Sequence, residues 1–160
     1  MIPMTMRELE RIREDCRKLV NKRASASAAA AVIPLPGVDV GADIAIMTEL
    51  LQKINRKFGL SEEQIDHLDA ATKGQIMVIA TSIGSEIIGK VLTKQTIMLL
   101  LKKVGGRVAA KQVTKFIPFV GQAVAAGISF GAMKMLGNSH IDECFEVCRR
   151  VIEERGSQSA

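Results

Sequence analysis

The chain contains no tryptophan and no tyrosine, and only five of its 160 residues are phenylalanine, although hydrophobic residues make up 48% of it. Its core must therefore be built from aliphatic side chains and methionine, packed closely through small residues. Only four prolines are present, and hairpin-turn dipeptides such as Asn-Gly are absent. These absences predict an all-α chain, whose length is that of one domain with a sizeable core.

Cysteine is also scarce, and the chain contains only Cys16, Cys144 and Cys148. This is an odd number, and the three residues do not have the spacing of a disulfide framework. The N-terminus is charged at Arg7 and has no apolar signal-peptide core. We therefore expect free thiols in a reducing cytoplasm.

Acidic residues are missing from residues 87–141, a stretch that contains eight lysines and arginines. The rest of the chain sums to −3, so this stretch more than accounts for the net charge of +5. Within it, Lys103, Arg107, Lys111 and Lys115 recur every four residues. On a helix, this spacing would place them in one basic ridge.

One motif that is present occurs twice and organises the chain. The segments 33–44 and 117–128 match at six of twelve positions, and both begin with Ile-Pro-x-x-Gly. Each copy follows an Ala-rich stretch and precedes an apolar helix that contains glycines. Because the residue before a proline avoids the helical region, both copies predict turns between helices. The structural residues of these turns are Ile33, Pro34, Pro36, Gly37, Ile117, Pro118 and Gly121.

Helix boundaries are indicated by local signals. Thr5-x-x-Glu8 and Ser61-x-x-Gln64 are capping boxes, and Ser139-x-x-Asp142 is a third helix start. The predicted helices include Thr5–Lys22, Ala24–Ile33, Asp39–Phe58 with Gly59 as its stop, and Ser139–Arg155. On the third of these, Val40, Ile44, Met47, Leu51, Ile54 and Phe58 form one apolar stripe.

We predict a compact single domain over residues 1–156, followed by a disordered tail at 157–160. It should contain about six to eight helices. The Gly-rich helices after the two pseudo-repeated Ile-Pro-x-x-Gly turns should be central, with the outer amphipathic helices Thr5–Lys22 and Ser139–Arg155 packed over them.

With these paired turns and the long apolar helix that ends in Phe-Gly, residues 24–155 resemble the YcjF-type family of bacterial helical domains. That family occurs in inner-membrane proteins and behind Ras-like GTPase domains. The resemblance implies an α-helical domain that is associated with a membrane or a GTPase. It implies no catalytic residues.

The segment from Gly84 to Lys90 matches most of a P-loop, and the apolar run Ile76–Ala80 stands upstream of it. However, Val91 occupies the position of the hydroxyl residue that binds Mg²⁺, and no base-recognition motif follows. We interpret the segment as a glycine-tolerant helix crossing. The alternative is a nucleotide site that the substitution Lys90→Ala would abolish.

His140, Cys144 and Cys148 are spaced four residues apart and share one helix face. A metal would need a further ligand such as Cys16 or His67, and this is not a recognised zinc spacing. No third group supports a nucleophile. We predict that the three side chains pack in the core, and we expect no metal, no cofactor and no catalytic residue.

The stretch Phe116–Met133 is uncharged over 18 residues and is interrupted by Pro118. Because spanning a bilayer takes about 20 apolar residues, we interpret it as a buried central helix. A re-entrant hairpin or a membrane span is the alternative.

The basic ridge has several candidate partners. Nucleic acid is the weakest, because readers of nucleic acid usually add aromatic stacking. Anionic lipid fits better, since each Lys or Arg near such a surface contributes about 1 kcal/mol and an apolar turn adjoins the ridge. An acidic protein is the third candidate, and a solvated face is the plain alternative. The candidate membrane- or partner-binding residues are Lys102, Lys103, Arg107, Lys111, Lys115, Phe116, Ile117, Phe119 and Val120.

The sequence therefore predicts a non-enzymatic helical adaptor that docks on an anionic membrane surface or on a membrane-associated GTPase or other protein. The alternative is a soluble protein-binding module, such as a scaffold, inhibitor or immunity-type partner, without membrane contact. We expect a cytoplasmic location at the periphery of the inner membrane, and the pattern leaves self-association open.

Overall fold

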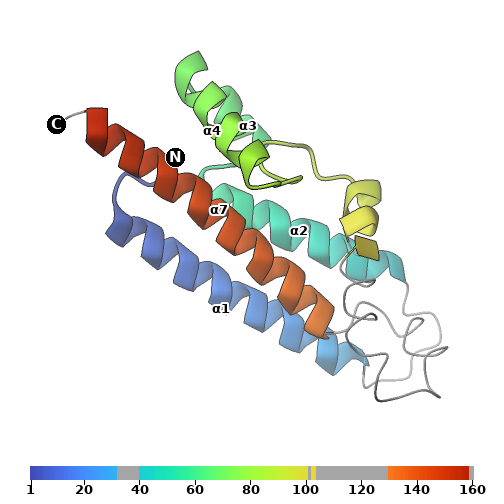
Figure 1. The fold of residues 1–160 in the computed structure, drawn as a ribbon. Helices are drawn as coiled ribbons and strands as arrows, with labels where there is room; N and C mark the ends of the chain where they lie inside the picture. Colours follow the sequence, from blue (N-terminus) through green and yellow to red (C-terminus); the bar gives the residue numbers. More distant parts are fainter. Residues whose placement is uncertain (32–39, 101, 104–129, 159–160) are drawn as a thin grey trace, which may run out of the picture.

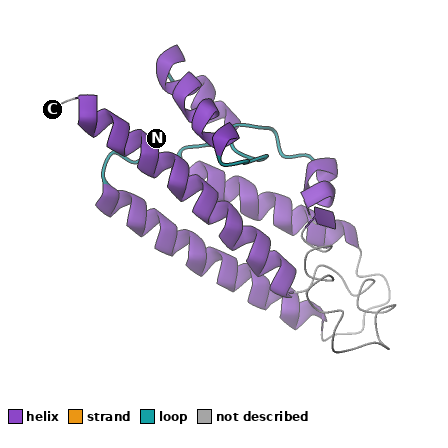
Figure 2. Cartoon of the chain, in the orientation of Figure 1, coloured by secondary structure: helices purple, strands orange, loops and turns teal. Residues whose placement is uncertain are grey.

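Helices make up most of the structure. The computed structural model describes residues 1–31, 40–100, 102–103 and 130–158, and these ranges contain helices and loops without any strand (Figure 2). The all-α prediction is confirmed. The helices are α1 (Met6–Ala31), α2 (Val40–Phe58), α3 (Glu62–Asp66), α4 (Ala70–Ser82) and α7 (Phe130–Gln158). Residues 94–100 and 102–103 are helical as well.

The long helices α1, α2 and α7 lie side by side and form the body of the domain (Figure 1). The contact between α1 and α7 is the most extensive, and α2 packs against both helices. The shorter α4 packs against α7. It runs antiparallel to α7, because Gln75 bonds Glu154 at one end while Ser85, just after α4, bonds Glu143 at the other.

The core is aliphatic, as the missing aromatic residues require. On α2, the predicted stripe is buried at Ile44, Met47, Leu51, Ile54 and Phe58. The matching side chains on α1 and α7 are also buried, and one continuous cluster joins the three helices. The helical spacing of the apolar residues in the sequence therefore predicted the buried face of α2 correctly.

The α1–α7 contact depends on one small residue. A Cβ atom on Gly137 of α7 would lie only 2.9 Å from Cγ2 of Val20 on α1. Close to this point along the two helices, Arg13 and Arg17 both donate to Asp142 Oδ1, at 3.2 and 3.3 Å. The glycine thus permits a close approach of the two helices, and the ion pairs border it at the surface.

The end of α2 is built as the sequence predicts. Gly59 has a φ of 74°, and the Gly59 and Leu60 amides donate to the carbonyls of Arg56 and Asn55. This is the Schellman pattern that a glycine after a helix favours. Ser61 and Gln64 then form the expected capping box of α3. The chain is therefore turned sharply between α2 and α3.

Other predicted boundaries are wrong. Helix α1 runs without a break through the Ala-rich residues to Ala31, because alanine continues a helix readily. Helix α7 begins at Phe130, so Ser139 lies inside a helix and does not start one. The first helix does begin directly after Thr5, as predicted, and Thr5 accepts from the Glu8 amide. The predicted capping box is incomplete, because the Glu8 carboxylate accepts from the Met4 amide and not from that of Thr5.

Some predictions concern residues outside the described ranges. The first copy of the motif, Ile33, Pro34, Pro36 and Gly37, lies there, as does the second, with Ile117, Pro118 and Gly121. The central, pseudo-symmetric arrangement of the following helices therefore stays a prediction. At the C-terminus, α7 continues to Gln158, two residues into the segment predicted as a tail.

Candidate functional site

Only the beginning of the predicted basic ridge is described. Lys102 and Lys103 are helical and exposed, and Lys103 donates to Glu86 Oε1 at 2.9 Å. That ion pair is the first cause of the lowered pKa of Glu86. The other candidate binding residues lie outside the described ranges, namely Arg107, Lys111, Lys115, Phe116, Ile117, Phe119 and Val120.

The same surface extends backwards from Lys102 in a way that the sequence analysis missed. We call residues 90–100 and 102–103 the lysine segment. Its exposed side chains include three further apolar residues and two further lysines, which are Val91, Met98, Leu99, Lys90 and Lys94. The sequence signal that could have shown this surface is the helical spacing of the apolar residues. Ile97 and Leu100 are buried on one side of the helix, which leaves Met98 and Leu99 on the other.

The loop before the lysine segment is tied firmly to the body of the domain. Ile87 and Ile88 are buried, and the Gly89 amide donates to the Leu60 carbonyl at 3.2 Å. Ser85 Oγ donates to Glu143 Oε2 on α7 at 2.8 Å. The loop is therefore bonded to α7 and to the turn after α2, and it fixes the start of the lysine segment relative to the body of the domain.

Beneath this loop lies a buried polar cluster. Asn55 of α2 accepts from His140 Nε2 at 2.7 Å and donates its amide to the Ile87 carbonyl at 3.4 Å. The Cys144 thiol also points to Asn55, with its sulfur 3.6 Å from Oδ1. His140 Nδ1 lies 3.5 Å from Glu143 Oε2. The cluster satisfies buried polar groups from three elements, which is a structural role.

The prediction that His140, Cys144 and Cys148 pack in the core is confirmed, since all three are buried. Burial raises the pKa of Cys144 well above its usual value and that of Cys148 to about 12. Burial also raises the pKa of Cys16 to about 11. Among the described residues, no three His, Cys, Asp or Glu side chains gather in a way that would hold a metal ion.

The P-loop-like segment has the wrong backbone for phosphate binding. Upstream, residues 76–80 belong to α4, where a P-loop would follow a strand. The amides of Gly84, Ser85 and Gly89 already donate to backbone carbonyls of the chain. Gly84 and Gly89 have φ values of 75° and 68°, so each forms a turn. The interpretation as a helix crossing is therefore wrong, because Gly84 follows the end of α4.

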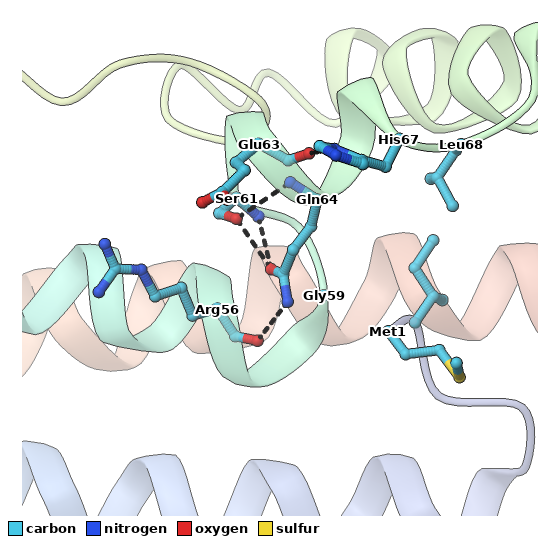
Figure 3. A pocket seen from close by; sticks show the side chains of 9 residues that line it. Met1, Arg56, Gly59, Ser61, Glu63, Gln64, His67 and Leu68 are labelled. Atoms are coloured by element: carbon cyan, nitrogen blue, oxygen red, sulfur yellow. Dashed lines mark hydrogen bonds between the residues drawn. The ribbon is translucent and has the colours of Figure 1, made fainter.

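A shallow hollow of about 550 Å³ opens where the N-terminus meets the turn after α2 (Figure 3). Its polar groups mostly bond one another: Ser61 pairs with Gln64, and His67 Nδ1 lies 2.7 Å from the Glu63 carbonyl. Figure 3 shows the guanidinium of Arg56 pointing away from His67. The groups do not converge on one ligand. The lining residues are Met1, Ile2, Arg56, Gly59, Ser61, Glu63, Gln64, His67 and Leu68.

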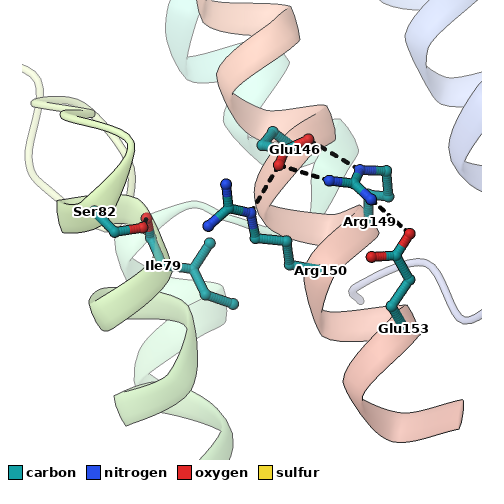
Figure 4. A network of polar contacts seen from close by, with 6 residues as sticks. All are labelled: Ile79, Ser82, Glu146, Arg149, Arg150 and Glu153. Atoms are coloured by element: carbon teal, nitrogen blue, oxygen red, sulfur yellow. Dashed lines mark hydrogen bonds and ion pairs between the residues drawn. The ribbon is translucent and has the colours of Figure 1, made fainter. Parts of the chain in front are cut away.

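A second polar group lies on the surface of α7 (Figure 4). Glu146 accepts from Arg149 Nη2 and from Arg150 Nε, both at 2.7 Å, and Arg149 also reaches Glu153. These two arginines lower the pKa of Glu146 to about 2. Figure 4 places Arg150 on the side of α7 that faces Ile79 of α4. The charges compensate one another, so the network stabilises α7 and offers no free charge to a ligand.

In the described part of the chain, no helix is both long enough and apolar enough to cross a membrane. The uncharged stretch Phe116–Met133 lies mainly outside that part, with Phe130 as the first residue of α7.

Comparison with known proteins gives a limited likeness to GTPases. No family profile and no solved structure matches the chain. The sequence is 26% identical over 149 residues to interferon-inducible GTPase 5 of Bos taurus, which covers 92% of this chain and 32% of that protein. The corresponding protein of Rattus norvegicus is 25% identical over the same coverage. The chain thus spans about a third of the length of these relatives.

Proposed function

We propose that the chain is a non-enzymatic helical adaptor that works with a GTPase partner in the cytoplasm, at the periphery of a membrane. The observation that supports it best is the 149-residue likeness to part of a protein named as a GTPase. The likeness covers nearly all of this chain but only a third of the relative. About two thirds of the relative therefore lies outside the matched region and can carry its other functions.

The fold supports an accessory role for the matched part. Nucleotide binding by a P-loop requires a glycine-rich loop between a strand and a helix, with free amides for the phosphates. The described residues contain helices and loops but no strand, and the amides of Gly84, Ser85 and Gly89 are already bonded. The resemblance to the YcjF-type family also leads to a GTPase partner.

The membrane part of the proposal is supported by charge. Residues 87–141 contain no acid and eight bases, and four of the five described members of this set are exposed, namely Lys90, Lys94, Lys102 and Lys103. A cytoplasmic protein with such a surface is attracted to anionic lipid.

Two measurements test the GTPase part. Calorimetry of the purified chain with GTP, GDP and Mg²⁺ should detect no binding. Binding that Lys90→Ala abolishes would show instead that the chain is itself a nucleotide-binding protein.

The second measurement captures the tagged chain from its own cells with either GDP or a non-hydrolysable GTP analogue present. We expect a stoichiometric partner that carries a GTPase domain, in amounts that differ between the two nucleotides. Recovery of a partner without such a domain would favour the soluble protein-binding module, and recovery of the chain alone would contradict both functions.

A further inference from the structure

The lysine segment exposes apolar and basic side chains together. Its apolar members are unusually open to solvent, with Val91 60% exposed, Met98 43% and Leu99 65%. Lys94 and Lys102 are exposed beside them. Exposed aliphatic side chains scattered singly need no explanation, but Met98 and Leu99 are neighbours on one helix and form a shared apolar surface.

The helical part of the lysine segment has a buried side and an outward side. Ile97 and Leu100 are buried and attach it to the domain. Lys94, Met98 and Lys102 are spaced four residues apart, so they lie in one row on the opposite side. Leu99 is next to that row. The segment is therefore amphipathic, but its outward side mixes lysine with apolar groups where a solvated helix would carry only polar ones.

The charge of this surface is strongly one-sided. The segment contains four lysines and no acid, and the nearest acid in sequence, Glu86, is already bound to Lys103. Within the part of the chain that the structure describes, Lys90, Lys94 and Lys102 form no ion pair with any carboxylate. The charge of Lys90 nevertheless contributes to the lowered pKa of Glu86, and Lys90 lines a hollow with Glu62 and Glu63. Lys94 and Lys102 are therefore the two cationic groups that we assign to an external anion.

The support below the surface keeps these groups in place. Asn55 and Gly89 bind the preceding loop to α2 and to the turn after it, and Ser85 binds it to α7. Because the loop is anchored at three points, the segment can present its outward side without first folding on a partner.

We propose that the lysine segment is a docking face for an anionic lipid surface. In the bound state, the ammonium groups of Lys94 and Lys102 contact headgroup phosphates, while Met98 and Leu99 enter the boundary between headgroups and acyl chains. This inference rests on the membrane part of the proposed function and names the surface that performs it.

Composition favours lipid over another macromolecule. Protein interfaces are centred on tryptophan, tyrosine and arginine and are depleted in lysine, whereas the segment contains four lysines and no tryptophan, tyrosine or arginine. Readers of single-stranded nucleic acid stack bases on aromatic rings, which the segment lacks. Lysine stems can lie along an apolar boundary while their charged heads reach phosphates.

The test is co-sedimentation of the full chain with vesicles of phosphatidylcholine alone or mixed with phosphatidylserine, at low and high salt. We expect binding only to the mixed vesicles. Since each lysine near such a surface contributes about fivefold, Lys94→Gln with Lys102→Gln should weaken low-salt binding roughly 25-fold. Leu99→Gln should weaken it about tenfold, and this loss should persist at high salt because it is apolar.

Matched controls make the result specific to the face. Lys18→Gln with Lys22→Gln removes the same charge from the exposed side of α1, and Val78→Gln removes an exposed apolar group from α4. Figure 1 shows both helices away from the lysine segment. These variants should bind vesicles within about twofold of the unchanged chain, since lipid attraction is a near-surface effect. All variants should keep the thermal midpoint, because the positions are exposed.

Several results would overturn the inference. Failure of the unchanged chain to bind anionic vesicles would do so, as would equal losses in the control and face variants. If vesicle binding is absent while the face variant loses its captured GTPase partner, the segment is a protein interface instead. If vesicles do not bind but capture of the GTPase is unaffected, only the lipid face is wrong and the GTPase part of the proposed function stands.

Discussion

His140 Nε2 on α7 lies 2.7 Å from Asn55 Oδ1 on α2, and the two side chains are only 1% and 2% exposed. The amide of the same Asn55 donates to the Ile87 carbonyl in the loop that precedes the lysine segment. One buried side chain therefore couples two long helices and the loop that carries the candidate binding face. Removing the Asn55 side chain should therefore weaken the contacts among α2, α7 and this loop.

We expect Asn55→Leu to lower the free energy of unfolding by about 2–3 kcal/mol, because it leaves His140 Nε2 and the Ile87 carbonyl buried without their partner. Urea unfolding followed by circular dichroism measures this. Gln52→Leu, a half-buried position one turn earlier on α2, is the matched control and should change stability by less than about 0.5 kcal/mol. Equal stability of the two variants would contradict the role of Asn55.

Gly59 and Gly74 should respond oppositely to alanine. A Cβ on Gly59 would lie 2.6 Å from the backbone of Met1 and Ile2, and its φ of 74° disfavours any side chain. Gly59→Ala should therefore cost about 2–4 kcal/mol. Gly74 lies in α4 with nothing near its Cβ position, so Gly74→Ala should stabilise by about 0.5–1 kcal/mol. Thermal and urea midpoints of both variants decide the matter.

The close approach of α1 to α7 should depend on the absence of a side chain at Gly137. A methyl group there would lie 2.9 Å from Cγ2 of Val20, inside a packed interface. Gly137→Ala should lower stability by about 1–3 kcal/mol through overpacking. Val20→Ala should recover part of that loss when the two are combined, although alone it costs stability by leaving a cavity. A double-mutant cycle that shows simple additivity would mean that the two residues do not collide.

The Glu146 network should make stability depend on acid pH. Hydrogen bonds from Arg149 and then Arg150 lower the pKa of Glu146 from its ordinary 4.5 to about 2. A carboxylate with a lowered pKa stabilises the fold above its unfolded pKa, and this contribution is lost as the pH falls from 4.5 towards 2. Because the Glu146 side chain is 30% exposed, we take the contribution as about 1 kcal/mol after screening.

Glu146→Gln should accordingly be less stable than the unchanged chain at pH 7, and the difference should vanish near pH 2. Glu14→Gln is the control, because Glu14 is exposed on α1 and forms no ion pair within the described residues. Urea midpoints over this pH range provide the measurement. A Glu146→Gln difference that persists below pH 2 would show that packing, and not charge, is responsible.

The three cysteines should be inert in the folded chain. Burial raises the pKa of Cys16 to about 11 and that of Cys148 to about 12, and Cys144 is fully buried. A thiol reagent at pH 8.5 should therefore react with them at the rate of chain opening, and all three together in urea. Ser157→Cys adds an exposed thiol that should react at once. Fast reaction of a native cysteine would contradict the buried placement.

Local signals in the sequence were sufficient for several elements. The apolar stripe of α2, its glycine stop and the capping box at Ser61 depend on residues within a few positions of one another. Such neighbours sample the same local geometry before the chain is compact, so their pattern alone indicates the element. The burial of Cys144 and Cys148 followed from helical spacing in the same way.

Other features were decided by tertiary structure. Helix α7 continues through Gly137 and Ser139, although both are weak helix formers, because its close contact with α1 outweighs local preference. The bond between Asn55 and His140 joins residues 85 positions apart, and no local pattern specifies it. The exposure of Leu99 depends on which side of its helix the body of the domain covers.

The sequence by itself thus determined an aliphatic, all-α chain, the extent and buried face of α2, and a long acid-free basic stretch. Only the tertiary structure decided which polar side chains meet inside, where α1 and α7 approach, and which apolar groups of the lysine segment stay outside. The physical reason is the range of the interactions: helix periodicity and capping act between neighbours, whereas burial and exposure depend on the packing of distant segments.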